Sequence, residues 1–238
     1  MIKHNKLSSI LTSSMISKEE IFRVNPHINP SLVLCDPLSI PEKIEQEPIR
    51  SWLRFVGEYK LKQDFFAIIL VPCSFWKPYT PPQDEFYRRI HRIGNKNSQI
   101  KFVTVSVPLA LQPDEFWNFS WKGQNLVYEC PFFPWIKNYG YAWSDELADR
   151  IFHLFKNTAK SFFKNNVGRY QAVLGCLIKE FGHIEIVNEF LDDNIDIHRP
   201  SKEIFSNVSY FDNTSDVYCH PTIWRKFTEM LVKWGIKV

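Results

Sequence analysis

The feature that most constrains the fold is the apolar run of residues 65–71, which ends at Pro72. A short run of this kind, rich in β-branched and aromatic residues, predicts a strand buried on both faces. A helical pattern follows over residues 84–94, and it opens with two acidic side chains that suit the positive end of a helix dipole. The segment therefore predicts a strand–loop–helix unit of an α/β fold.

Similar patterns recur along the chain. Apolar runs at residues 100–107, 126–130 and 170–176 predict three more strands. Helical spacing of apolar residues predicts helices over residues 47–61, 144–163, 181–191 and 221–234. Strands that alternate with helices or long connections indicate a three-layer α/β domain, in which helices cover both faces of a mostly parallel sheet.

We place this α/β domain at residues 47–238. Residues 1–46, with a short helix after Ser17 and a proline-rich connector, are expected to form an N-terminal extension. Residues 192–217 are polar and predict a loop.

Composition argues against several classes of protein. The chain has only 8 glycines and contains neither GxGxxG nor GxxxxGK[ST], which argues against a dinucleotide oxidoreductase and a P-loop NTPase. The 5 cysteines form no CxxC pair and predict reduced thiols rather than a disulfide framework or a structural zinc site. His183 and Glu185 are too weak a pair to predict a metal site, so we expect no metal and no cofactor.

Charge and hydropathy bear on location and partners. No apolar run approaches the length needed to span a membrane, and the first residues lack a small-residue cleavage signal. We therefore expect a cytoplasmic protein without a membrane partner. The formal net charge of +3 permits a nucleic-acid partner but does not require one.

Reactive side chains gather directly after the first predicted strand: Cys73, Ser74, Lys77 and Tyr79. Ligands of open α/β sheets bind just beyond the carboxyl ends of strands, so this loop is the candidate site. The alternative is that Cys73 is a small core hydrophobe and that Lys77 is simply solvated.

A second candidate loop follows the strand at residues 100–107. Pro108 and Pro113 bracket an apolar segment and indicate a fixed strand-exit loop. Asp114 and Glu115 come next, and we expect one of these carboxylates to face the same crevice as Cys73.

Two features are candidates for contact with nucleic acid. Arg88, Arg89 and Arg92 share a face of the helix predicted over residues 84–94, and a lysine face lies at residues 156–164. Aromatic residues are dense between 121 and 143, where they can stack on a base or form the core under a long loop. We favour the core.

These motifs resemble those of the archaeosine synthase family. Residues 72–79, PCSFWKPY, resemble the start of its P-C-S-x-x-K-P-Y-x-x-S-x-S-H motif. Residues 106–116 are similar to its S-x-P-L-x-x-x-P-x-E loop, and residues 128–131, YECP, to its Y-D-x-P element. The resemblance covers roughly residues 50–235, with the three motifs in order, each at the end of a predicted strand.

The chain also departs from the family pattern. Where the motif has S-x-S-H, this sequence has PQDE, so that Glu85 stands in place of the histidine. The 238 residues include neither a tRNA-guanine-transglycosylase-like region nor a PUA domain. The resemblance therefore indicates a divergent, stand-alone member, with separate subunits that supply RNA binding.

The resemblance implies archaeal-type tRNA modification, in which an amine adds to the nitrile of a 7-cyano-7-deazaguanine base. It implies a transferase with Cys73, Lys77 and Glu115 as catalytic residues. Further residues are implied to bind substrate: Ser74, Tyr79, Ser106 and Glu85. Two alternatives remain: a non-catalytic RNA-binding or accessory subunit of a tRNA-modification complex, and, on fold analogy alone, a base-excising enzyme.

Overall fold

The structure is a computed structural model that describes residues 18–79, 84–132, 134–178, 182–188, 195–200 and 214–238. Its centre is a five-stranded sheet in the order β3-β2-β1-β6-β7, in which only β3 is antiparallel to its neighbour. The strands are β1 (Phe65–Pro72), β2 (Ile100–Ser106), β3 (Ala110–Pro113), β6 (Tyr170–Cys176) and β7 (Ile195–His198). A separate hairpin is formed by β4 (Ser120–Trp121) and β5 (Gln124–Asn125).

The first predicted strand is the central one. β1 pairs with β2 on one side and with β6 on the other, and its residues from 67 to 72 are fully buried. Gly175 allows β6 to approach closely, because a Cβ at this position would lie 2.9 Å from the carbonyl oxygen of Leu70. The buried, β-branched run therefore occupies the middle of the sheet, where the largest share of its apolar surface is removed from contact with water.

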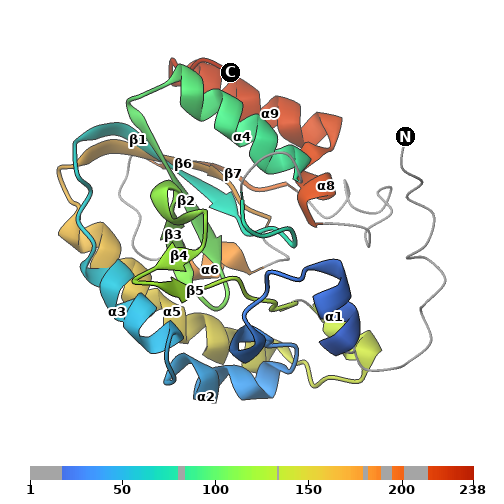
Figure 1. Ribbon diagram of the computed structural model, residues 1–238. Helices are drawn as coiled ribbons and strands as arrows, with labels where there is room; N and C mark the ends of the chain where they lie inside the picture. Colours follow the sequence, from blue (N-terminus) through green and yellow to red (C-terminus); the bar gives the residue numbers. More distant parts are fainter. Residues whose placement is uncertain (1–17, 80–83, 133, 179–181, 189–194, 201–213) are drawn as a thin grey trace.

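Helices cover both faces of the sheet (Figure 1). One face carries α4 (Glu85–Lys96), α8 (Thr214–Cys219) and α9 (Pro221–Lys233); the other carries α3 (Ile49–Glu58), α5 (Asp145–Asn165) and α6 (His183–Val187). Asp84 caps α4 by accepting a hydrogen bond from the Tyr87 amide, and Ser144 caps α5 in the same way. The three-layer α/β prediction is confirmed.

The described part of the N-terminal segment packs into the same core as the sheet. It comprises α1 (Lys18–Val24), η1 (Pro30–Leu32), η2 (Pro37–Ser39) and α2 (Ile40–Ile44). Ile21, Leu32 and Ile40 are buried members of the common hydrophobic cluster. Backbone hydrogen bonds join Leu32 and Leu34 to Glu129, so this segment lies directly against residues 127–130.

Two sequence predictions differ from the structure. Residues 126–130 form no strand, because the backbone of Glu129 bonds to Leu32 and Leu34 and makes only an isolated bridge with Val33. Residues 192–217 were predicted as a loop, but they contain β7 and most of α8. β7 is a four-residue edge strand whose residues are only half-buried, so its sequence carries little apolar signal.

Four described aromatic residues of the segment belong to or pack against the core, as predicted. Trp121 and Phe132 are buried, and Tyr141 and Trp143 pack against the cluster. Short 3-10 turns occur at η3 (Asp114–Phe116) and η4 (Pro134–Tyr139). Within the described ranges, no helix has the length and apolarity that crossing a membrane requires.

Candidate active site

The site lies where the order of strands changes direction. The chain passes from β1 through α4 to β2 on one side, and it later enters β6 on the other side of β1. Crevices that bind ligands in open α/β sheets form outside the carboxyl ends of strands at such a point. Cys73 follows β1 at this edge, and its amide donates to the Val105 carbonyl at 3.0 Å.

A histidine reaches Cys73 from the segment after β6. Cys73 Sγ lies 3.3 Å from Nε2 of His183. His183 is the first residue of α6 and is 4% exposed. Gly182 precedes it with a φ of +69°, and a Cβ there would lie 2.0 Å from Cζ of Phe152. Only glycine fits this turn without displacing Phe152, so the position of His183 depends on it.

A buried lysine and a buried glutamate complete the cluster. Lys77 is 3% exposed, and its Nζ lies 4.1 Å from the ring centroid of Tyr128, a cation–π contact. Asn25 holds the backbone nearby by donating its side-chain amide to the Lys77 carbonyl at 3.2 Å. Glu129 is also buried, and its Oε2 accepts no hydrogen bond from any described residue.

Burial sets the protonation of these groups. It raises the pKa of the Cys73 thiol, and the charge of Lys77 only partly opposes this. Burial, and then the charge of Lys77, lower the pKa of His183 to about 4. Burial also raises the pKa of Glu129, against the opposing charge of Lys77. At neutral pH the resting pair is therefore a neutral thiol beside a neutral imidazole.

The loop that carries these groups is held by side-chain hydrogen bonds. Ser74 Oγ bonds to Asp84, the residue that caps α4. The backbone amide of Ser74 donates to the Tyr79 hydroxyl at 3.3 Å, and the Tyr87 hydroxyl donates to the Pro72 carbonyl at 2.8 Å. Ser74 thus orients the loop through its hydroxyl and its amide.

Two tyrosines line the cluster. The hydroxyls of Tyr79 and Tyr128 are 3.5 Å apart, and Tyr79 stacks on Tyr87 with ring centroids 4.0 Å apart. Burial raises the pKa of both hydroxyls well above the ordinary value, so both stay protonated and can donate hydrogen bonds. Ser106, fully buried at the end of β2, lies beside the Tyr128 hydroxyl.

The prediction that Glu115 or Asp114 faces Cys73 is wrong. Both carboxylates form ion pairs with Lys101, at the start of β2, and Glu115 also accepts a hydrogen bond from Tyr59. The reason is the direction of β3. It runs antiparallel to β2 and returns the chain to the amino-terminal edge of the parallel strands.

The other predicted residues divide in the same way. Cys73, Ser74, Lys77, Tyr79 and Ser106 come together at the carboxyl edge of the sheet. Glu85, in contrast, forms ion pairs with Arg88 and Arg89 of its own helix α4, and so points away from Cys73. Arg92 is exposed further along α4.

Sequence reasoning missed the two partners that the structure adds. Glu129 stands in the YECP segment, which was singled out for its similarity to a Y-D-x-P element with an acidic residue at the same place, so a signal was present. His183 had none, because 110 residues separate it from Cys73 and no local pattern marks it. Only the pairing of β6 with β1 brings its segment to the site.

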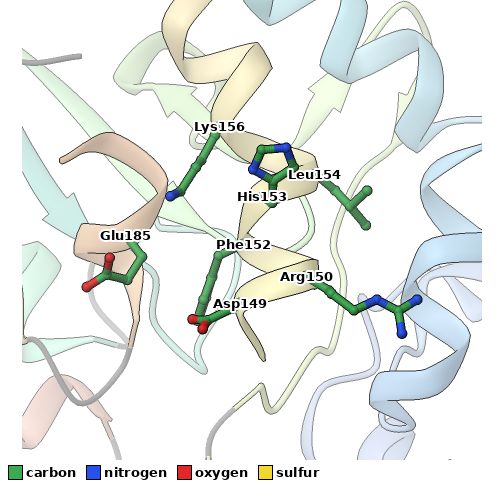
Figure 2. Close-up of a pocket in the computed structure, with 7 residues that line it drawn as sticks. All are labelled: Asp149, Arg150, Phe152, His153, Leu154, Lys156 and Glu185. Carbon is green, nitrogen blue, oxygen red and sulfur yellow. The ribbon is translucent and has the colours of Figure 1, made fainter. Parts of the chain in front are cut away.

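A hollow of about 670 Å³ lies on the surface of α5 and α6. Figure 2 shows Lys156 and Phe152 on the side of α5 that faces Glu185, whereas Arg150 and Leu154 point to the opposite side. Its walls carry both signs of charge, and none of the predicted site residues lines it. Within the part of the chain that the structure covers, no group of three or more ligating side chains is arranged to hold a metal ion.

The fold and the site define a doubly wound α/β protein with a cysteine–histidine pair at the switch point of its sheet. No protein-family model, no curated protein and no solved structure matches the chain. Its function must therefore be argued from its own residues.

The buried imidazole predicts a pH dependence of stability. Between pH 6.5 and about 4 the unfolded chain takes up a proton on His183, whereas the folded chain does not. The free energy of unfolding is therefore expected to fall over this interval, by at most about 3 kcal/mol from this residue. Above pH 6.5 the imidazole is neutral in both states and contributes no slope.

Urea unfolding at several pH values measures this effect. His183→Gln is expected to flatten the profile between pH 4 and 6.5 relative to the wild type. Cys73→Ala is the control, because it keeps the buried imidazole and should retain the slope. Parallel profiles for the wild type and His183→Gln would show that His183 is protonated alike in both states.

Proposed function

We propose that this protein is a transferase that adds an amine to an electrophilic carbon, with the nitrile of a 7-deazaguanine base in tRNA as its substrate. The observation that carries the reaction class is the cluster that the half-buried Cys73 forms with the buried His183, Lys77 and Glu129 at one edge of the sheet. A nitrile carbon needs a nucleophile, a proton for the developing anionic nitrogen and a site that excludes water. The cluster offers all three, and the choice of base and of tRNA follows from the motif resemblance.

In the first step, Cys73 adds to the nitrile. The S–H bond breaks, a C–S bond forms at the nitrile carbon, and the proton passes through His183 to the nitrile nitrogen, giving a thioimide. An amine then attacks the same carbon and the C–S bond breaks. One amine proton returns to the sulfur, and the product is an amidine. His183 acts as general base and then as general acid, as its neutral resting state permits.

Lys77 and Glu129 act on the charges that develop. The Lys77 ammonium stabilises the thiolate character of Cys73, which is the direction of its effect on the pKa of that thiol. Glu129 Oε2 is available to accept a hydrogen bond from the incoming amine. It takes the role that the resemblance implied for Glu115, which lies at the opposite edge of the sheet. In the alternative route, Lys77 donates to the nitrile nitrogen while a free amine attacks directly.

The test is a mass-spectrometric assay of tRNA that carries 7-cyano-7-deazaguanine, incubated with the protein and candidate amines. Lys77→Met removes the charge and keeps an unbranched apolar chain over Tyr128, so the fold should persist. We expect conversion to fall at least about 100-fold in this variant, because charge stabilisation in a buried site is lost. Full activity in a folded Lys77→Met variant would exclude Lys77 from the reaction.

One observation favours the alternative function, a non-catalytic accessory subunit that binds RNA. Lys77, Ser74 and Tyr79 are almost completely buried, and aromatic rings pack around them. The hypothesis of an accessory subunit predicts such a filled site. The same assay separates the two functions, since an accessory subunit binds tRNA but changes the mass of no base with any amine.

A further inference from the structure

Positive charge is concentrated on one layer of the molecule. The two long helices of this layer, α4 and α9, lie side by side over one face of the sheet (Figure 1). They carry four and three basic residues respectively, with one glutamate each. This excess of five positive charges is larger than the net charge of +3 of the whole chain. The rest of the molecule is therefore slightly acidic.

Three of the basic side chains of α4 line a hollow between α4 and α9. It measures about 400 Å³ and is lined from α4 by Glu85, Arg89, Arg92, Ile93 and Lys96, and from the other side by Trp224 and Val238. Arg89, Arg92 and Lys96 recur at helical spacing, so they form one stripe roughly 10 Å long. A single glutamate, Glu85, faces this stripe from within the hollow.

Two of these arginines differ in how they are held. Arg89 bonds to Glu85 at 2.8 Å and lies 5.0 Å from the ring centroid of Trp224, so its guanidinium is oriented before any ligand binds. Arg92 is exposed and has no ion-pair partner among the described residues. A fixed guanidinium beside an unpaired one is suited to bind successive phosphates of a flexible chain.

The basic layer is continuous with the candidate site. α4 begins directly after Asp84, which bonds to Ser74 of the Cys73 loop. Arg88 and Arg89 therefore lie in the first turns of the helix, at the edge of the sheet where Cys73 lies. A polyanion bound along α4 would pass close to that edge.

We infer that the α4–α9 face is the docking surface for the phosphodiester backbone of the RNA whose base reaches the Cys73 site. The inference rests on the proposed function for the identity of the partner. The backbone binds through charge and without reading sequence, so its affinity falls with salt in proportion to the number of phosphates contacted.

The test is fluorescence anisotropy with a labelled, unmodified tRNA transcript at several salt concentrations. The variant combines Arg92→Gln, Arg225→Gln and Lys226→Gln, three exposed positions outside the candidate site. We expect binding at least about 10-fold weaker near 0.1 M salt, and a slope of log K against log salt that is smaller by about 2 to 3. The matched control removes the same number of positive charges from α5, through Lys156→Gln, Lys160→Gln and Lys164→Gln. Its affinity for tRNA should stay within about 2-fold of the wild-type affinity.

Several results would overturn the inference. These are no tRNA binding by the wild type, equal losses in the two triple variants, or no loss in either. Competition by polyglutamate as effective as that by RNA would assign the face to an acidic peptide instead. Conversion of the nitrile base is scored separately. If the α4–α9 variant loses binding but the wild type converts no base, the docking surface is supported and the proposed reaction is rejected. If the wild type converts the base but the variant binds tRNA as well as the wild type does, the reaction is supported and the docking surface is rejected.

Discussion

Replacing Cys73 with alanine is expected to lower conversion of the nitrile base by at least about 1,000-fold, with folding unchanged. Alanine removes the nucleophile, and an amine must then attack the nitrile without a covalent intermediate. The thiol is half-buried and takes no part in the hydrogen bonds of Ser74 with Tyr79 and Asp84, so its loss leaves these bonds intact. The assay is mass spectrometry of the tRNA base, with circular dichroism as the check on folding.

Cys176→Ala is the matched control. Cys176 is equally small and is buried at the end of β6, but the structure places no substrate role on it. We expect its activity to stay within about 2-fold of the wild type. Wild-type protein incubated with substrate and no amine should also form a covalent adduct with the tRNA, and after ribonuclease digestion the Cys73 peptide should carry the mass of the modified nucleotide. Activity retained in Cys73→Ala would instead support direct attack by the amine.

The largest effect on stability is expected at the opposite edge of the sheet. Lys101→Met leaves the carboxylates of Asp114 and Glu115 without their shared cation, in a setting where their side chains are 30% and 26% exposed. Breaking a largely buried ion pair in this way is expected to lower the free energy of unfolding by about 2–4 kcal/mol. Urea unfolding at pH 7 measures the loss.

The pH dependence of this loss tests its cause. Burial opposes ionisation of Glu115, but hydrogen bonds from Lys101 and Tyr59 hold its pKa below the ordinary value of 4.5. The stability that this carboxylate contributes is therefore present above pH 4.5 and is lost as pH falls through the lower folded-state pKa. The difference between the wild type and Lys101→Met should shrink in acid. A difference that is constant with pH would point to lost packing.

The position of Glu115 also has a functional consequence. Because it lies with Lys101 and Tyr59, Glu115→Gln is expected to leave the rate of conversion unchanged.

Much of the architecture follows from local patterns in the sequence. The apolar run at residues 65–71 specifies a strand that only the centre of a sheet can bury, and it became β1. Asp84, Ser144 and Pro221 are strong signals for the start of a helix, and α4, α5 and α9 begin directly after or at them. The gathering of Cys73, Ser74, Lys77 and Tyr79 was predictable because they follow one strand within a single short loop.

What the sequence could not determine is which distant residues meet that loop. Glu115 and Glu129 both follow proline- and apolar-rich segments, and only the antiparallel direction of β3 sends one to the far edge. The backbone bonds of Leu32 and Leu34 hold Glu129 beside Lys77, and they come from a segment almost 100 residues away. His183 reaches Cys73 through the pairing of β6 with β1. Local patterns report a few neighbouring residues, whereas a site at the edge of a sheet is assembled by long-range pairing, and that is decided in the tertiary structure.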